Sequence, residues 1–219
     1  MDRTDEIAGQ RDIAGVLVPH TKLIGDAVEY ARAHYEPYLF NHVMRSWLFA
    51  VRIAQIKGIS HDGEVLAVGT LLHDVTLNDD FTGPRRFEVE AADIVRDYVL
   101  RQGMEMHRAQ LIWDSVALNA TPSIGLYKEA EVALCTAGIG LDVVGYQYDV
   151  IPTAEIDAIV KLFPRLDLKR KMTRCFCRMA ETAPATSYGN FLQDFGLRYV
   201  PGYRAPSVTD LLLQAPFDD

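Results

Sequence analysis

The sequence is short of cysteine, of long apolar runs and of positive charge. Three cysteines do not make the even set of a disulfide framework, and Cys175 and Cys177 lack the two-residue gap of common zinc or redox pairs. We therefore expect free thiols in a reducing compartment. No apolar run reaches the roughly 18–20 residues that cross a bilayer. The polar N-terminal stretch lacks the apolar core of a signal peptide, so a cytoplasmic location without membrane contact is expected.

The charge balance argues against a nucleic-acid partner. The chain has 219 residues, a net charge of -8 and a pI of about 5.2. Nucleic acids and anionic membranes both favour a basic face. A hydrophobic content of 49% and a charged content of 24% are ordinary for a globular protein of this length.

Helical periodicity dominates the chain, and no convincing alternating strand pattern is present. Apolar residues recur every three or four positions, separated by proline, glycine and capping residues. We predict one all-α domain over residues 1–219, with a loosely ordered lead-in at 1–20 and an extended tail at 199–219. The last two helices could pack on each other or on a second chain, so a homo-oligomer stays open. The predicted helices, about eight or nine in number, span 22–33, 38–56, 63–74, 86–102, 105–119, 128–146, 153–163, 166–181 and 187–195.

Four ionisable residues fall on faces that are otherwise apolar. An apolar run at 65–72 leads straight into His73 and Asp74, and His42 and Asp142 lie on apolar helical stripes. A single buried His or Asp is commonly a hydrogen-bonded core residue, a cap or an ion-pair partner. Two imidazoles and two carboxylates together favour a divalent metal ion, because burying unpaired charge is costly. Adjacent helical residues point about 100° apart, so His73 and Asp74 converge only if the helix frays or turns there.

Four segments carry a resemblance to a known family: "FNHVMRSWLFA" (40–50), "LLHDVTLNDDF" (71–81), "RFEVEAADIV" (86–95) and "AGIGLDVVG" (137–145). In this order they resemble the cyanamide-hydratase-like branch of the HD-domain superfamily of metal-dependent hydrolases. His42, His73, Asp74 and Asp142 match its H…HD…D ligand pattern. The resemblance implies a single HD-domain helical bundle that holds one divalent ion, Zn²⁺ in the first place, with Fe²⁺, Mn²⁺ or Ni²⁺ as alternatives.

Two departures from the family bear on the substrate. Many phosphate-cleaving relatives have Gly and a basic residue where this chain has Thr76 and Leu77, and hydratase-like relatives often have His where this chain has Asn119. The resemblance therefore implies an enzyme, a hydratase or hydrolase, that directs an activated water at a small nitrogenous molecule of cyanamide, nitrile or amide type. A phosphohydrolase acting on a nucleotide or phosphate ester, and a non-catalytic metal-binding regulatory or ligand-binding module, stay open as alternatives.

Further site candidates follow from their positions beside the predicted ligands. Each also has an ordinary explanation as a loop carboxylate, helix-terminal charge, ion-pair partner, helix cap or core aromatic. Trp47 belongs with the aromatic residues that either line a pocket or fill the core. The candidates are Asp74, Asp79, Glu88 and Asn119 for catalysis, and Arg45, Thr76, Asn78, Phe81 and Phe87 for substrate binding.

Overall fold

The computed structural model describes residues 9–77, 81 and 83–217, and their contacts cluster in two compact units. The first unit comprises 1–76 with 88–168, and the second comprises 77–87 with 169–219. Across the described residues there are eleven α-helices and one two-stranded sheet, which confirms the all-α prediction. Within the same residues, no helix combines the length and apolarity needed to cross a membrane.

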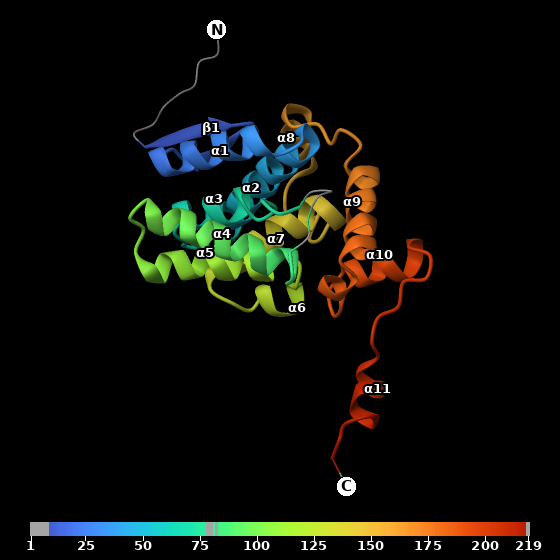
Figure 1. The fold of residues 1–219 in the computed structure, drawn as a ribbon. Coiled ribbons are helices and arrows are strands. Elements are labelled where there is room, and N and C mark those ends of the chain that lie inside the picture. The colour runs from blue at the N-terminus through green and yellow to red at the C-terminus, as the bar shows by residue number, and fades with distance from the viewer. Residues whose placement is uncertain (1–8, 78–80, 82, 218–219) are drawn as a thin grey trace. The chain divides into compact units, whose positions relative to one another are not determined.

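The first unit contains a β-hairpin and eight helices. Figure 1 shows the hairpin and α1 at one end of this unit and α6 at the opposite end. Its longest helix, α2, packs along α7 through the middle. The elements are β1 (Gln10–Ile13), β2 (Val16–Pro19), α1 (Lys22–His34), α2 (Pro37–Lys57), α3 (Gly63–Leu71), α4 (Phe87–Arg101), α5 (Met106–Leu118), α6 (Pro122–Gly125), α7 (Ala130–Val144) and α8 (Thr153–Leu162).

The hairpin corrects the prediction of a loosely ordered lead-in. β1 and β2 pair antiparallel around a two-residue turn at Ala14 and Gly15, both with positive φ. Such a turn matches the twist of the flanking strands. Val16 and Val18 are buried, and they anchor the hairpin to the helices. With four residues in each strand, the alternation was too short to be recognised against the helical background.

Gly138 sets the close approach of α7 to α2. A Cβ at this position would lie 2.7 Å from the Cβ of Ala50 and would overlap the backbone oxygen of Ser46. Only glycine therefore fits at this crossing. Asp142 follows one helical turn later, so the same crossing brings its carboxylate against α2.

We expect Gly138→Ala to destabilise the fold by about 1–3 kcal/mol, because the added methyl group overfills a rigid helix crossing. Denaturant unfolding monitored by circular dichroism measures the change. Gly140→Ala on the same helix is the matched control, because a Cβ there would make only an ordinary contact, 3.4 Å from Tyr146. The control should be neutral or stabilising by up to about 1 kcal/mol. Equal stability of the two variants would contradict the packing argument.

The start of α3 is held by a charged cluster. Asp62 caps the helix by accepting from the backbone N–H groups of Glu64 and Val65. Arg108 on α5 donates to both carboxylates, at 2.7 Å to Asp62 and 2.9 Å to Glu64. The helix behind this cap is buried from Val65 to Leu71. The helix ends at Leu71, whereas the predicted helix extended to residue 74.

Arg108→Gln should destabilise the protein by up to about 1 kcal/mol at neutral pH, since the cluster is partly exposed and screened. Burial acts to raise the pKa of Asp62, but Arg108 and the capping N–H groups outweigh it; Arg108 also lowers the pKa of Glu64. Groups with lowered folded-state pKa contribute stability above their unfolded values of 3.8 and 4.5 and lose it as pH falls. The difference from wild type should therefore shrink below about pH 4. Arg101→Gln, on the exposed end of α4, is the control; a pH-independent loss in Arg108→Gln would contradict this account.

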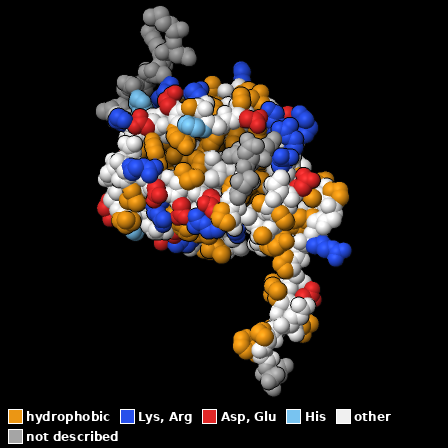
Figure 2. All heavy atoms as spheres, in the orientation of Figure 1, with side chains coloured by type: hydrophobic (Ala, Val, Ile, Leu, Met, Phe, Trp, Pro, Cys, Tyr) orange, Lys and Arg blue, Asp and Glu red, His pale blue; other side chains and the backbone are white. Residues whose placement is uncertain are grey.

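The second unit is built around aromatic side chains. Its elements are α9 (Leu168–Thr182), whose first residue belongs to the first unit, the 3₁₀ helix η1 (Pro184–Ser187), α10 (Leu192–Tyr199) and α11 (Val208–Leu213). The rings of Phe176, Phe191 and Phe195 contact one another edge to face. The predicted extended tail at 199–219 instead contains α11, whose side chains are all exposed, and Figure 2 shows hydrophobic side chains along this segment.

Candidate metal centre

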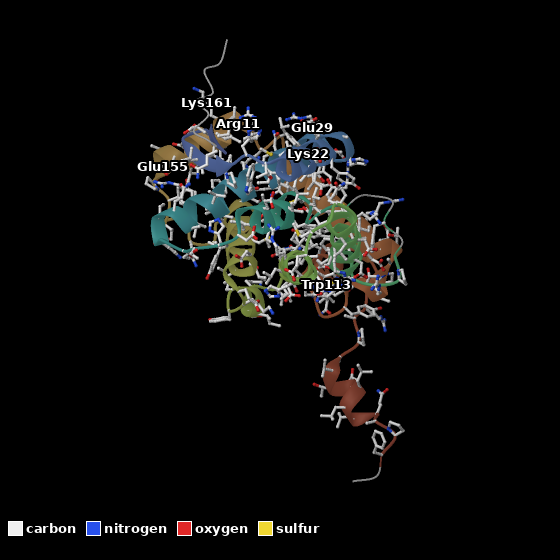
Figure 3. All side chains as sticks on the ribbon, turned by 90° about the vertical axis from the view of Figure 1, so that its left-hand side faces the viewer. Arg11, Lys22, Glu29, Trp113, Glu155 and Lys161 are labelled. Carbon is white, nitrogen blue, oxygen red and sulfur yellow. The ribbon has the colours of Figure 1, made fainter. Side chains whose placement is uncertain are left out.

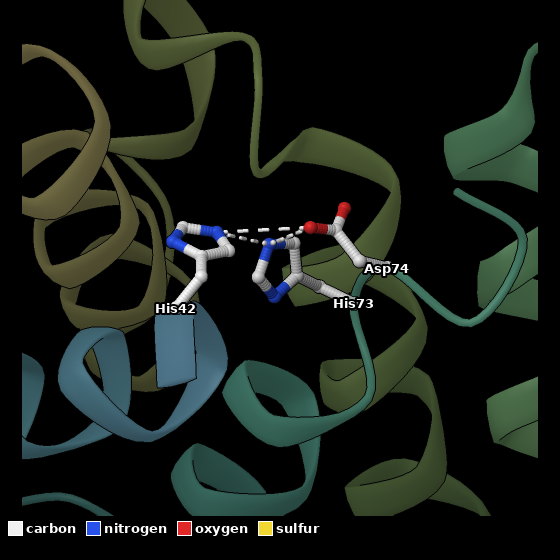
Figure 4. Close-up of side chains that lie close together, drawn as sticks. All are labelled: His42, His73 and Asp74. Atoms are coloured by element: carbon white, nitrogen blue, oxygen red, sulfur yellow. Dashed lines mark hydrogen bonds and ion pairs between the residues drawn. The ribbon is translucent and has the colours of Figure 1, made fainter. Parts of the chain in front are cut away.

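Three of the predicted ligands meet at one buried point (Figure 4). The Nε2 atoms of His42 and His73 lie 3.3 Å apart. Asp74 Oδ2 lies 3.6 Å from the first and 3.1 Å from the second. All three residues are at most 3% exposed. Two imidazole nitrogens and one carboxylate oxygen at this spacing form a group that could hold a metal ion.

The end of α3 explains how two adjacent residues converge. His42 comes from the middle of α2, whereas His73 and Asp74 follow Leu72, the C-terminal capping residue of α3. Both lie in a turn, so the angle of about 100° between helical neighbours does not apply. The expectation that the chain turns at this point is confirmed.

Hydrogen bonds on the far side of each ring assign the tautomers. His42 Nδ1 donates to Asp142 Oδ2 at 2.7 Å, and His73 Nδ1 donates to the backbone oxygen of Thr70 at 2.8 Å. A neutral imidazole with Nδ1–H presents a lone pair at Nε2. Both lone pairs therefore face the same point as Asp74 Oδ2, which is the arrangement in which outer partners orient histidines toward a metal.

The electrostatics of this point favour a positive charge. Asp74 Oδ2 is buried and has no hydrogen-bond partner in the described structure. Burial alone would raise the pKa of Asp74, but the two histidines outweigh burial and lower it. Burial likewise acts to lower the pKa of His73, and the Asp74 carboxylate reverses that effect. Burial does lower the pKa of His42, against the pull of Asp142. A cation between the three groups would offset the repulsion between the two nitrogen lone pairs and the carboxylate oxygen.

Asp142, the fourth predicted ligand, lies behind His42 rather than with the other three. Arg45 grips its carboxylate with two hydrogen bonds of 2.7 Å, and Arg165 donates to Oδ1 at 3.1 Å. Burial acts to raise the pKa of Asp142, but Arg45 and His42 outweigh it and hold the pKa far below its usual value. With these donors in place, Asp142 fixes the ring of His42 from outside the cluster.

Arg45 and Arg165 differ from what the sequence indicated. Arg45 was predicted to bind substrate, but it is completely buried and paired with Asp142, which is the alternative that its position left open. Arg165 was missed, because it lies beyond α8 in a segment with no motif. Its Nη1 also donates to the backbone oxygen of Asp142 at 2.8 Å. No local sequence pattern indicates that the chain returns to α7 after α8.

The predicted polar candidates next to the ligands are buried. Asn119 Nδ2 donates to the backbone oxygen of Val116 at 2.7 Å at the end of α5, and the predicted catalytic role of Asn119 stays a prediction. Glu88 is fully buried in the first turn of α4, where a carboxylate is favoured by the helix dipole. Thr76 is 8% exposed and lies in the turn that carries His73 and Asp74.

The remaining candidates lie in or near the second unit. Phe87 is 1% exposed, and its ring contacts Phe191 edge to face. This contact makes Phe87 part of the aromatic core, a correction to its predicted role as a substrate contact. Phe81 is also buried. Asn78 and Asp79 lie outside the described residues.

Tyr35 is a residue beside the cluster that the sequence did not reveal. It follows α1, and its buried hydroxyl makes no hydrogen bond of 3.5 Å or less in the described structure, the backbone N–H of Asp74 being a more distant neighbour. The pKa of Tyr35 is raised well above its usual value, first by burial and then by the Asp74 carboxylate, while the backbone N–H of Asp74 acts in the opposite direction. The phenol therefore lies close to Asp74. An aromatic residue between two helices gives no sequence signal beyond core packing.

Comparison with known proteins adds no relative. The chain matches no protein-family model and no curated protein sequence. The candidate metal centre is therefore defined by its own geometry, in which two oriented imidazoles and one unpartnered carboxylate oxygen converge.

Proposed function

We propose that the protein is a metal-dependent hydratase or hydrolase of the HD-domain type, which adds water to a small, uncharged nitrogenous molecule. One observation carries the proposal: Asp74 Oδ2, buried and without a hydrogen-bond partner, faces two imidazole lone pairs at 3.1 and 3.6 Å. Two His and one carboxylate are a common ligand set of catalytic zinc, with further coordination positions open to water. A bound divalent ion supplies hydroxide near neutral pH by lowering the pKa of a coordinated water.

The surrounding residues hold the ligands in place. Asp142 keeps the proton of His42 on Nδ1, and the backbone oxygen of Thr70 does the same for His73. Arg45 balances the charge of Asp142, so that this carboxylate stays ionised in a buried setting. The unpartnered hydroxyl of Tyr35 provides a hydrogen-bonding group that a substrate beside Asp74 can use.

The charges near the cluster favour a neutral substrate over a phosphate ester. Arg45 and Arg165, which the structure brings to this region, each donate to Asp142. The Asp142 carboxylate balances one of these two positive charges, and both guanidinium groups also donate to backbone oxygens of the protein. Phosphate recognition usually relies on Arg or Lys donors directed at the phosphate oxygens. Leu77, next to the turn, adds no charge.

A substrate screen tests the proposed function. Cyanamide, small nitriles and small amides are compared with nucleotides and p-nitrophenyl phosphate, using protein loaded with Zn²⁺, Fe²⁺, Mn²⁺ or Ni²⁺. We expect ammonia release, or the hydrated product, from the nitrogenous group and none from Asp74→Ala. Phosphate release that depends on Asp74 would favour the phosphohydrolase instead. Full metal content without turnover of either group would favour a binding or regulatory module.

Tyr35→Phe should separate substrate handling from folding. Because the hydroxyl has no protein partner, its removal should leave stability unchanged or raise it by up to about 1 kcal/mol. Metal content should also be unchanged, while kcat/KM on the best substrate should fall about 3–10-fold, the value of one hydrogen bond. Tyr30→Phe, on the preceding turn of α1, serves as the control. Wild-type kcat/KM in Tyr35→Phe would remove the tyrosine from the mechanism.

A further inference from the structure

A second concave site lies in the first unit, apart from the metal cluster. It is a groove of about 910 Å³ bordered by the hairpin, α1, the middle of α2 and the end of α8. Neither His42, His73 nor Asp74 lines it. Its volume falls in the range of pockets that bind small organic molecules, about 300–1,000 Å³.

The walls of the groove are mainly apolar. Leu17 and Val18 come from the hairpin, and Leu162 and Phe163 come from the end of α8. Trp47 of α2 also lines the groove, and at 1% exposed it is nearly all covered by protein. The α1 and α2 side chains that complete the apolar lining are Ile24, Val28 and Met44.

Trp47 also brings an unused hydrogen-bond donor to this site. Its Nε1 is buried and has no acceptor in the described structure. The other tryptophan, Trp113, donates to Asp93 at 2.8 Å, as buried indoles usually do. A buried donor without an acceptor is destabilising.

Two arginines line the groove, and neither is held in a buried ion pair. The side chain of Arg11 makes no hydrogen bond or ion pair within the described part of the chain, and Figure 3 labels it with Glu29 at the edge of the first unit. Arg32 lies 3.6 Å from Glu29, which also lines the groove, and both side chains are largely exposed. The Arg32 guanidinium also lies over the Phe40 ring, 4.5 Å from its centroid. Such exposed ion pairs contribute little to the stability of the folded protein. Asp12, also in the lining, already accepts the backbone N–H of Gly15.

We infer that this groove binds an elongated, mainly apolar carboxylate, such as an alkyl or aryl carboxylic acid. Its apolar body lies on the Ile24, Val28 and Met44 side of the groove. Its carboxylate pairs with Arg11 or Arg32, and Trp47 forms part of the apolar wall. The inference is independent of the chemistry at the metal centre, because none of the residues that line the groove belongs to the metal-ligand set.

Titration with dodecanoate, kept below its micelle concentration, tests the site. Isothermal calorimetry on the unmodified protein should show saturable binding of one molecule per chain. Fluorescence of Trp47, recorded in the Trp113→Phe variant, should change with the same dissociation constant. Dodecan-1-ol, which has the same chain without the charge, should bind at least about tenfold more weakly, the loss expected for one charge-assisted hydrogen bond.

Gly25 offers a way to fill the groove without disturbing the fold. It lines the groove within α1, and a Cβ there would meet no atom within 4 Å. Gly25→Leu should abolish dodecanoate binding, whereas the matched Gly25→Ala should retain it. The double substitution Arg11→Gln with Arg32→Gln should weaken binding about tenfold or more. Metal content should be unchanged in all of these variants.

Several results would overturn the inference. These are no saturable binding to the unmodified protein, equal affinity for dodecanoate and dodecan-1-ol, and unaltered binding in a folded Gly25→Leu variant. None of them would touch the proposed metal chemistry, which depends on separate residues.

Discussion

His73→Ala is expected to reduce bound metal from about one ion per chain to nearly none. His73 supplies one of three converging ligand atoms, and alanine leaves His42 Nε2 and Asp74 Oδ2 without a partner that can share the ion. Catalytic zinc sites rely on about three protein ligands, so the loss of one should reduce affinity sharply. Inductively coupled plasma mass spectrometry on purified, dialysed protein measures the metal content.

The control for this experiment is a histidine on the surface. His107 is exposed near the start of α5, so His107→Ala should keep full metal content. Circular dichroism should show helical content in both variants, which separates loss of the site from loss of the fold. Chelation of the wild-type protein should lower its melting temperature, since an ion that binds only the folded state stabilises it. Stoichiometric metal in a folded His73→Ala variant would rule out the assigned centre.

Arg45→Met is expected to destabilise the protein by about 3–5 kcal/mol, the usual cost of removing one partner from a buried ion pair. Arg45 is completely buried and makes two hydrogen bonds to Asp142, which Arg165 only partly replaces. Methionine preserves the apolar stem and removes the charge. Chemical denaturation at neutral pH measures the loss.

The same variant should also weaken metal binding, by about 10–100-fold, because Asp142 orients His42. Arg52→Met is the matched control on the same helix. Arg52 pairs with Glu155 of α8 at 2.9 Å, but both side chains are partly exposed. Its removal should cost less than about 1 kcal/mol and leave metal affinity unchanged. Equal losses of stability in the two variants would show that burial of the Arg45–Asp142 pair does not account for the effect of Arg45→Met.

Local pattern was sufficient for most of the helices. Apolar spacing, Asp62 as a cap and Gly58 after α2 are read from neighbours within a few residues. The observed bounds of α1, α2 and α5 differ from the predicted ones by at most one residue at each end. The hairpin and α11 were missed, because four-residue strands and a six-residue helix carry too little periodicity.

The sequence by itself also identified the ionisable residues that lie within buried, apolar segments. His42, His73 and Asp74 were recognisable because each interrupts an apolar pattern, and such interruptions depend only on local order. The turn after Leu72 lets His73 and Asp74 converge, but it is the packing of α2 with α3 that brings His42 to them.

Only the tertiary structure decided the second layer of the site. Gly138 lets α7 approach α2, and that approach gives the Asp142 carboxylate to Arg45 and to the outer nitrogen of His42. Arg165, in the segment that follows α8, donates to the same carboxylate. The physical reason is that hydrogen bonds select between atoms a few ångströms apart, and the relative placement of helices distant in sequence sets those distances.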